Sequence, residues 1–176
     1  MSELGSAPLP LPGDGDHVRG PASALTLIEY SDFECPFCAA LHVQLAAAAV
    51  RVVFRHFPVR SSHPRAWAAA CAAEAASAQG RFWDMHDRLF ADQARLEDPH
   101  LWRRAEALSL DLERFDSERR SEPVLERVRR DFHSGVRAGV VTTPTVFELS
   151  TGQPRRTDVS ELEALLAGGG RPAPTG

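Results

Sequence analysis

The chain contains no lysine and no asparagine, and its only isoleucine is Ile28. All twenty basic residues are therefore arginine, which we interpret as the codon bias of a GC-rich genome. The net charge at pH 7 is −4, and the pI is near 6.0. This balance does not fit the basic surface of nucleic-acid-binding proteins or the polybasic segment that binds anionic membranes. We therefore expect neither a nucleic-acid partner nor a membrane partner.

Long apolar runs and abundant cysteine are also missing. No stretch approaches the ~18 apolar residues of a transmembrane helix. The N-terminal segment does not fit a secretory signal, because Glu3 precedes the first basic residue, Arg19, and prolines interrupt its apolar part. An odd count of three cysteines argues against the disulfide framework of a secreted protein. We therefore expect a cytoplasmic protein, in which a close cysteine pair is more often catalytic or metal-binding than structural.

The length of 176 residues and the hydrophobic fraction of 43% suit one globular domain with a real core. We predict an α/β domain at 23–167 with flexible ends at 1–22 and 168–176. The predicted elements, in chain order, are a strand at 24–30, a helix that begins near residue 35, a strand at 50–57, a helical insertion at about 63–138, a strand after Pro144, a weak strand candidate at 153–157, and a helix that ends at Gly168. The first two strands and the helix between them would form a parallel βαβ unit.

Two cysteines separated by a Pro-Phe pair follow the first predicted strand, in the segment DFECPFC. Cys35 lies in the first turn of the predicted helix, where free backbone N–H groups and the helix dipole stabilise a thiolate. Cysteines in such positions have a pKa of about 3.5–7.5 instead of about 8.5. Cys38 lies one turn further on the same face, so it can resolve a mixed disulfide formed at Cys35. Pro36 suits the first turn, and Phe37 adds no charge, so the helix end must do most of the acidifying.

Other interpretations of the cysteine pair remain open. An i, i+3 pair among three cysteines arises by chance about 3% of the time, and the pair could be two inert buried thiols. A zinc site would need two more ligands, and neither Cys71 nor the seven scattered histidines stand at ligand spacing, so we expect no metal. We interpret Cys71, in an alanine-rich helix, as a small buried hydrophobic residue.

Further residues are compatible with redox chemistry. Glu29 lies in the first strand, six residues before Cys35, and could be either a buried acid of raised pKa or a solvated glutamate at the strand edge. Pro144, in TTPT, could form a cis peptide bond that presents the Thr143 backbone to an extended substrate. The aromatic side chains of Phe57 and Trp67 could line a groove, but core packing is the commoner role.

The segments LIEYSDFECPFC, VVFRHFPV, GRFWDMHDRLF and GVVTTPTVFEL together resemble the DsbA-like branch of the thioredoxin superfamily, over about residues 15–167. The resemblance implies a thioredoxin-like fold with an inserted helical domain and no bound cofactor. It also implies roles for single residues: Cys35 as the exposed nucleophile, Cys38 as the resolving cysteine, Glu29 as the buried acid, Pro144 as a cis-proline, and Thr143, Pro144, Pro36 and Phe37 as the residues that contact substrate.

The sequence thus predicts a thiol-disulfide oxidoreductase that exchanges disulfides with proteins, or with a small thiol such as glutathione or mycothiol, and with a further redox partner. The competing hypothesis is a non-catalytic module in which the cysteines act as a redox switch or hold a metal. The direction of disulfide transfer, the natural substrate and the oligomeric state are left open.

Overall fold

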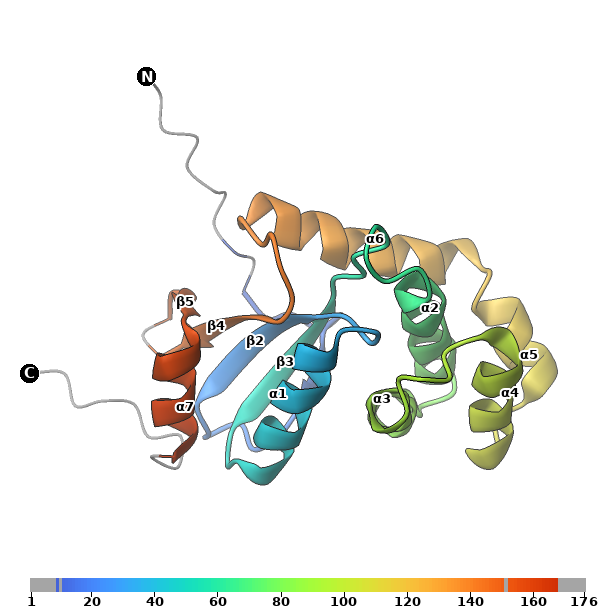
Figure 1. Cartoon of the computed structure of the whole chain (residues 1–176), viewed down its shortest axis with the longest axis horizontal. Helices are drawn as coiled ribbons and strands as arrows, with labels where there is room; N and C mark the ends of the chain where they lie inside the picture. The colour runs from blue at the N-terminus through green and yellow to red at the C-terminus, as the bar shows by residue number, and fades with distance from the viewer. Residues whose placement is uncertain (1–8, 10, 151, 168–176) are drawn as a thin grey trace, which may run out of the picture.

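The computed structural model describes residues 9, 11–150 and 152–167, which form a sheet with helices on both faces (Figure 1). The five strands are β1 (His17–Arg19), β2 (Thr26–Ser31), β3 (Arg51–His56), β4 (Thr145–Leu149) and β5 (Arg155–Thr157). Their order across the sheet is β1-β3-β2-β4-β5. Strands β2 and β3 are parallel, and all other pairs are antiparallel. The predicted βαβ unit is therefore confirmed.

Seven helices are found in the described part of the chain. They are α1 (Pro36–Ala47), α2 (Ala66–Ser77), α3 (Phe82–Ala91), α4 (Asp98–Ala107), α5 (Leu112–Glu118), α6 (Glu122–Arg137) and α7 (Val159–Ala167). Helices α2–α6 lie between β3 and β4 in the chain. Figure 1 shows α2–α5 grouped beside the sheet, whereas α6 runs from that group back over the sheet.

Strand β2 is apolar on both faces because both faces are covered. Leu27 packs with residues of α1 and α7, whereas Ile28 and Tyr30 pack on the α6 side. A strand that is buried on both faces reads as a continuous apolar run, as the sequence of β2 does. Glu29 and Ser31, on the same face as Leu27, are the exceptions. Both are buried, and Glu29 lines a cavity together with His42, Leu45 and Ala46 of α1.

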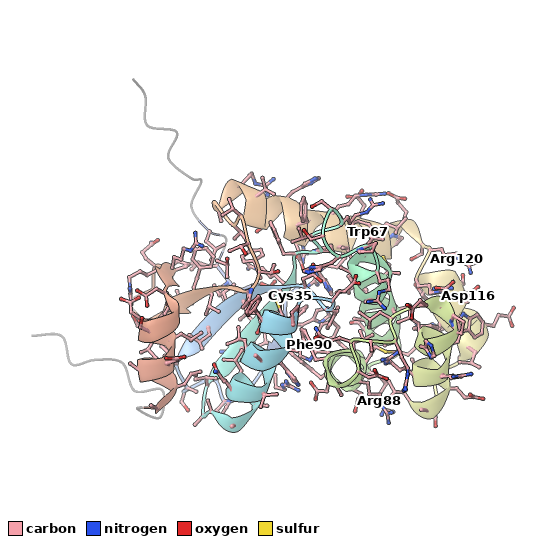
Figure 2. All side chains as sticks on the ribbon, in the orientation of Figure 1. Cys35, Trp67, Arg88, Phe90, Asp116 and Arg120 are labelled. Atoms are coloured by element: carbon pink, nitrogen blue, oxygen red, sulfur yellow. The ribbon has the colours of Figure 1, made fainter. Side chains whose placement is uncertain are left out.

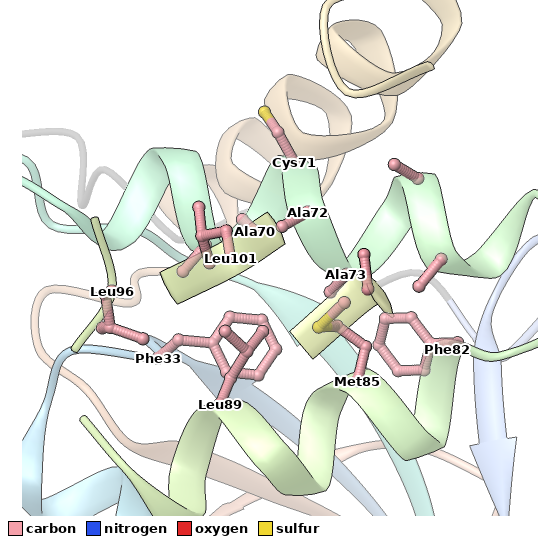
Figure 3. Close-up of a cluster of buried hydrophobic side chains, with 14 of the residues drawn as sticks. Phe33, Ala70, Cys71, Ala72, Ala73, Phe82, Met85, Leu89, Leu96 and Leu101 are labelled. Carbon is pink, nitrogen blue, oxygen red and sulfur yellow. The ribbon is translucent and has the colours of Figure 1, made fainter. Parts of the chain in front are cut away.

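The largest core cluster joins the helical group to the redox motif. The alanines of α2 allow α3 and α4 to approach closely, and Figure 3 shows Met85 and Leu89 of α3 directed toward them. Phe33, from the loop between β2 and α1, inserts into this cluster and lies 4.9 Å from Phe90, between ring centroids. Cys35 and Cys38 belong to the same cluster. The packing of the helices therefore fixes the position of the cysteines.

The structure departs from the sequence prediction at the N-terminal side. Residues 1–22 were expected to be flexible, but β1 forms there and pairs with β3. Tertiary contacts explain why this segment is ordered. The His17 ring stacks on the Phe82 ring, with centroids 3.4 Å apart, and hydrogen-bonds Glu74. Residues 1–8 and 10, the predicted tail 168–176 and the predicted stop at Gly168 lie outside the described residues. The limits of the domain and of the helical insertion stay predictions.

The stability of the α6–sheet contact rests on one residue without a side chain. A Cβ atom added to Gly135 would lie 2.7 Å from the Phe57 ring and 2.9 Å from the Tyr30 ring. Gly→Ala within a helix normally stabilises by about 1 kcal/mol, but overpacking two buried rings costs about 1–3 kcal/mol. We expect Gly135→Ala to lower the free energy of unfolding by up to about 2 kcal/mol in urea titrations. Gly13→Ala, with open space around its Cβ position, should have little effect, and equal stability of the two variants would contradict this packing account.

Candidate active site

The redox motif occupies the junction between β2 and α1. Cys35 is the N-cap of α1, with extended backbone angles (φ −79°, ψ 121°), and Pro36 is the first helical residue. The Cys35 carbonyl accepts hydrogen bonds from the backbone N–H groups of Cys38 and Ala39, at 3.1 and 3.2 Å. Figure 2 shows Cys35 at the end of α1, between the sheet and the helical group. The cysteine thus lies one position before the expected first turn, at the positive end of the helix dipole.

The two thiols have opposite tendencies to ionise. A hydrogen bond from the Cys38 thiol lowers the pKa of Cys35 to about 5, against the effect of burial, and Thr143 and the backbone N–H groups of Cys38 and Phe37 contribute. Burial raises the pKa of Cys38 above its ordinary value, and the hydrogen bond to Cys35 raises it further. At neutral pH, Cys35 is therefore a thiolate and Cys38 a thiol.

The Cys35 side chain is more enclosed than the resemblance implied. It was expected to be exposed, but the residue has only 3% of its surface accessible. Its Sγ lies 3.4 Å from the Thr143 carbonyl oxygen, and the residue packs against the helical cluster. By contrast, Phe37 is 72% exposed and Val141 is 82% exposed. Apolar surface is thus presented beside the nucleophile rather than by the nucleophile itself.

The loop before β4 faces the cysteines. The Thr143–Pro144 peptide bond is cis. Phe37, Thr143 and Pro144 line a groove of about 390 Å³, together with apolar residues of α1, β4 and α7. The groove brings together three of the four residues expected to contact substrate. Pro36, the fourth, is exposed at the start of α1 and does not line this groove.

Glu29 is the buried acid rather than a solvated glutamate at the strand edge. The residue is 2% exposed, and its Oε1 atom is buried without a hydrogen-bond partner. Burial raises the pKa of Glu29 to about 7, although Ser31 and Arg19 act in the opposite direction. Ser31 also lies close enough to Cys38 to lower the pKa of that thiol. The sequence analysis did not identify Ser31. It lies two residues after Glu29 in β2, so the two side chains are on the same face of the sheet.

Two further residues that the sequence analysis missed support the junction. The Asp32 carboxylate accepts hydrogen bonds from the backbone N–H groups of Glu34 and Val59, both at 2.8 Å, and contacts His63 Nδ1 at 2.9 Å. Asp32 could have been suspected from its place just before the helix start. Gln93 donates to the carbonyls of Phe33 and Cys35, at 2.9 and 2.8 Å. Gln93 is almost sixty residues away, so no local signal marks it.

Metal-capable side chains gather elsewhere. Among the described residues, the groups of three that could hold an ion are His17, His56 and Glu74, and His42, His86 and Asp87. Neither group includes a cysteine. In the first, both histidines hydrogen-bond Glu74 Oε1, at 2.6 and 2.7 Å. Although burial raises the pKa of Glu74, these hydrogen bonds bring it below its ordinary value, so the carboxylate is held charged between the two histidines.

A pair of thiols at a strand–helix junction, opposite a cis-proline on a central sheet, defines a thioredoxin-like protein. A family model described as thioredoxin matches residues 13–151. The chain therefore belongs to the thioredoxin family.

Solved structures of DsbA-like proteins share this fold. A thioredoxin-like oxidoreductase from Silicibacter pomeroyi superposes with a TM-score of 0.74 at 22% identity, covering 88% of this chain and 92% of that one. BdbD from Bacillus subtilis superposes with a TM-score of 0.70 at 19% identity, covering 95% and 98%. DsbA2 from Pseudomonas aeruginosa gives 0.68 at 24% identity, covering 88% and 93%. The expected thioredoxin-like fold is confirmed.

Relatives of higher sequence identity are longer proteins that are named as Na⁺/H⁺ antiporters. A Na⁺/H⁺ antiporter NhaA from Salinispora tropica is 43% identical over 145 residues, which is 79% of this chain and 22% of the antiporter. One from Mycolicibacterium gilvum is 43% identical over 173 residues, which is 92% of this chain and 28% of the antiporter. The chain thus spans about a quarter of these relatives. No helix in the described part of the chain is long and apolar enough to cross a membrane.

The separation of the two thiol pKa values can be measured directly. We expect Cys35 to react with iodoacetamide with a midpoint near pH 5, whereas Cys38 stays unmodified up to pH 9. Peptide mass mapping of the reduced protein across this pH range checks the assignment. The buried Cys71, whose pKa burial raises to about 12, is the internal control for an unreactive thiol. Equal alkylation of Cys35 and Cys38 would overturn it.

Burial of Glu29 also makes stability depend on pH. Its pKa is about 7 in the folded protein and 4.5 ordinarily, so the folded state favours the protonated acid. Protonation of Glu29 therefore stabilises the folded state relative to its ionised form. This contribution to the free energy of unfolding is complete below about pH 4.5 and is lost as the pH rises through about 7. The loss amounts to about 3 kcal/mol. In the disulfide form, where Cys35 does not titrate, Glu29→Gln should gain about this much over the wild type between pH 4.5 and 8.

Urea titrations at several pH values measure this difference. The exposed Glu113 on α5 provides the matched control, and Glu113→Gln should follow the wild-type pH dependence. A constant difference between Glu29→Gln and the wild type across the range would show that Glu29 does not have a raised pKa.

Proposed function

We propose that the protein is a thiol-disulfide oxidoreductase that uses Cys35 and Cys38 as its redox pair and needs no bound cofactor. The observation that carries this proposal is the contrast between the two sulfurs: the pKa of Cys35 is lowered to about 5 and that of Cys38 is raised. Exchange requires one cysteine that attacks as a thiolate and a second that stays protonated until it is needed. The thioredoxin family and the DsbA-like fold support the same activity.

We propose the following reaction. The Cys35 thiolate attacks one sulfur of a substrate disulfide, and the other substrate sulfur leaves as a thiolate. Cys38 then transfers its proton to the ionised Glu29 carboxylate and attacks Cys35 Sγ. The products are the Cys35–Cys38 disulfide and the second substrate thiolate, so the protein loses two electrons and the substrate gains them. The same steps in reverse insert a disulfide into a substrate.

We assign substrate binding to the surface around the groove. Phe37, two residues after Cys35, and Val141, two residues before Thr143, expose apolar surface. Phe37 also lines the groove together with Pro144. An extended polypeptide can bury an apolar side chain there while its backbone pairs with the backbone of Thr143. This surface favours a protein substrate over glutathione or mycothiol, and we place Pro36 at its rim.

The direction of disulfide transfer depends on whether the protein stabilises the reduced or the disulfide form of the Cys35–Cys38 pair. A thiolate at Cys35 that is stabilised at neutral pH favours the reduced form, which makes the disulfide a stronger oxidant. We therefore propose that the protein donates disulfides more readily than thioredoxin does. Its odd number of cysteines leaves Cys71 without a partner, which favours a reducing compartment, and we propose that the exchange takes place in the cytoplasm.

Trapping of the first covalent intermediate tests this function. We expect Cys38→Ser to accumulate a mixed disulfide between Cys35 and a denatured, disulfide-containing protein such as scrambled ribonuclease, because no thiol can resolve it. Cys71→Ser should turn over like the wild type. Mass analysis of acid-quenched samples measures the adduct. If Cys38→Ser forms no adduct, the cysteine pair is not an exchange centre, and the hypothesis of a redox switch or metal-holding module replaces it.

A further inference from the structure

A cavity of about 300 Å³ lies against Glu29, apart from the substrate groove. Its polar wall consists of Glu29 from β2, His42 from α1, His86 from α3 and Arg19 from β1. The space has room for several water molecules, at about 30 Å³ each in the liquid. The unpartnered Oε1 atom of Glu29 is the one buried carboxylate oxygen in the described residues that lacks a hydrogen bond. The cavity therefore adjoins the acid that the proposed exchange requires.

The polar groups of this wall, together with Asp87 behind it, are ordered from the interior to the surface. The exposed fraction is 2% for Glu29 as a residue, and for side chains it is 3% at His86, 16% at His42 and 47% at Asp87. His86 Nδ1 hydrogen-bonds Asp87 Oδ1 at 2.8 Å, and His42 Nε2 lies 3.8 Å from the same oxygen. The two imidazole rings meet edge to face, with centroids 5.1 Å apart. Titratable groups thus lead from Glu29 to solvent.

The remaining charged group at the cavity is held in place. Arg19 donates to both oxygens of Asp87 at 2.9 Å, and its guanidinium lies 4.4 Å from the centre of the Trp83 ring. Burial lowers the pKa of His42 and of His86, the latter to about 4; the charge of Arg19 adds a smaller effect in the same direction, and Asp87 opposes it. Both imidazoles are therefore neutral at pH 7. A neutral imidazole accepts a proton at one nitrogen and donates one from the other, which is what a relay requires.

We propose that the proton released by Cys38 leaves Glu29 through this cavity, with His42 as the relay residue and the His86–Asp87 pair as its positioning support. The inference rests on the proposed function. When Cys38 attacks the mixed disulfide, its proton moves to the Glu29 carboxylate. Protonated Glu29 then returns the proton to solvent through His42, so the carboxylate is ready for the next cycle. When the protein donates its disulfide, the proton travels inward along the same route and restores the Cys38 thiol.

The experiment follows the resolving step in two variants of His42. The reduced protein is held at pH 6, where Glu29 starts protonated and must lose that proton before it can accept the one from Cys38. It is mixed with glutathione disulfide, quenched with acid, and analysed by mass for the decay of the Cys35–glutathione adduct. His42→Ala opens space for a small base, whereas His42→Phe keeps the ring that stacks on Phe90 but has no nitrogen. We expect decay of the adduct to slow by about tenfold or more in both variants, at the lower end of the usual effect of a lost proton-transfer group.

Added imidazole distinguishes a relay from a structural role. It should restore the decay rate of His42→Ala in proportion to its concentration, and it should leave His42→Phe slow. His100→Ala, on α4 away from this cavity, should match the wild type with and without imidazole. Wild-type decay in either His42 variant would overturn the relay, as would a slow His42→Ala that imidazole does not restore.

The same experiment separates failure of the relay from failure of the proposed function. A wild type that forms and resolves the glutathione adduct establishes exchange at Cys35 and Cys38, whatever the His42 variants do. A wild type that forms no adduct with glutathione disulfide or with scrambled ribonuclease contradicts the proposed function, and the relay falls with it.

Discussion

The chemistry of this protein depends on the contrast between a helix terminus and a buried interior. Cys35 lies at the N-terminus of α1, where backbone N–H groups and the Cys38 thiol stabilise its thiolate. Cys38, one turn deeper, lies in a core that disfavours charge. A displacement of three residues along the helix would bring Cys38 to the position that Cys35 occupies. The register of the junction between β2 and α1 therefore decides which sulfur attacks and which resolves.

Several distant parts of the chain hold that register. Asp32 ties the junction to the segment that follows β3, and Gln93 ties it to the end of α3. Phe33 anchors the same loop in the aromatic cluster of the helical group. The helices between β3 and β4 thus support the cysteines from the side, besides flanking the sheet. A thioredoxin-like sheet alone would leave this loop without those contacts.

Much of this arrangement could be predicted from the sequence, because its signals are local. The apolar runs marked β2 and β3. Asp158 and Glu161 have the spacing of a capping box, and they form its two reciprocal hydrogen bonds at the start of α7. The Cys-Pro-Phe-Cys spacing marked the redox pair. Strand β1 carries no such signal, since it has three residues and depends on contacts with β3, Phe82 and Glu74.

The enclosure of the site was equally hidden from the sequence. Whether Glu29 is buried depends on which face of β2 it occupies and on what covers that face, which alternation alone does not decide. The same holds for Cys35, whose low exposure comes from the Thr143 loop more than one hundred residues later. The cavity beside Glu29 is formed by β1, α1 and α3, three segments that only the fold brings together.

The measurement that tests the account most directly is a redox titration of the Cys35–Cys38 pair against a graded thiol/disulfide buffer, followed by mass. The account predicts a single two-electron disulfide with a potential well above the value of about −270 mV typical of thioredoxin, toward the value of about −120 mV typical of DsbA. A potential at or below thioredoxin's would contradict the stabilised thiolate. If no disulfide forms between the two cysteines, the proposal of an exchange enzyme fails.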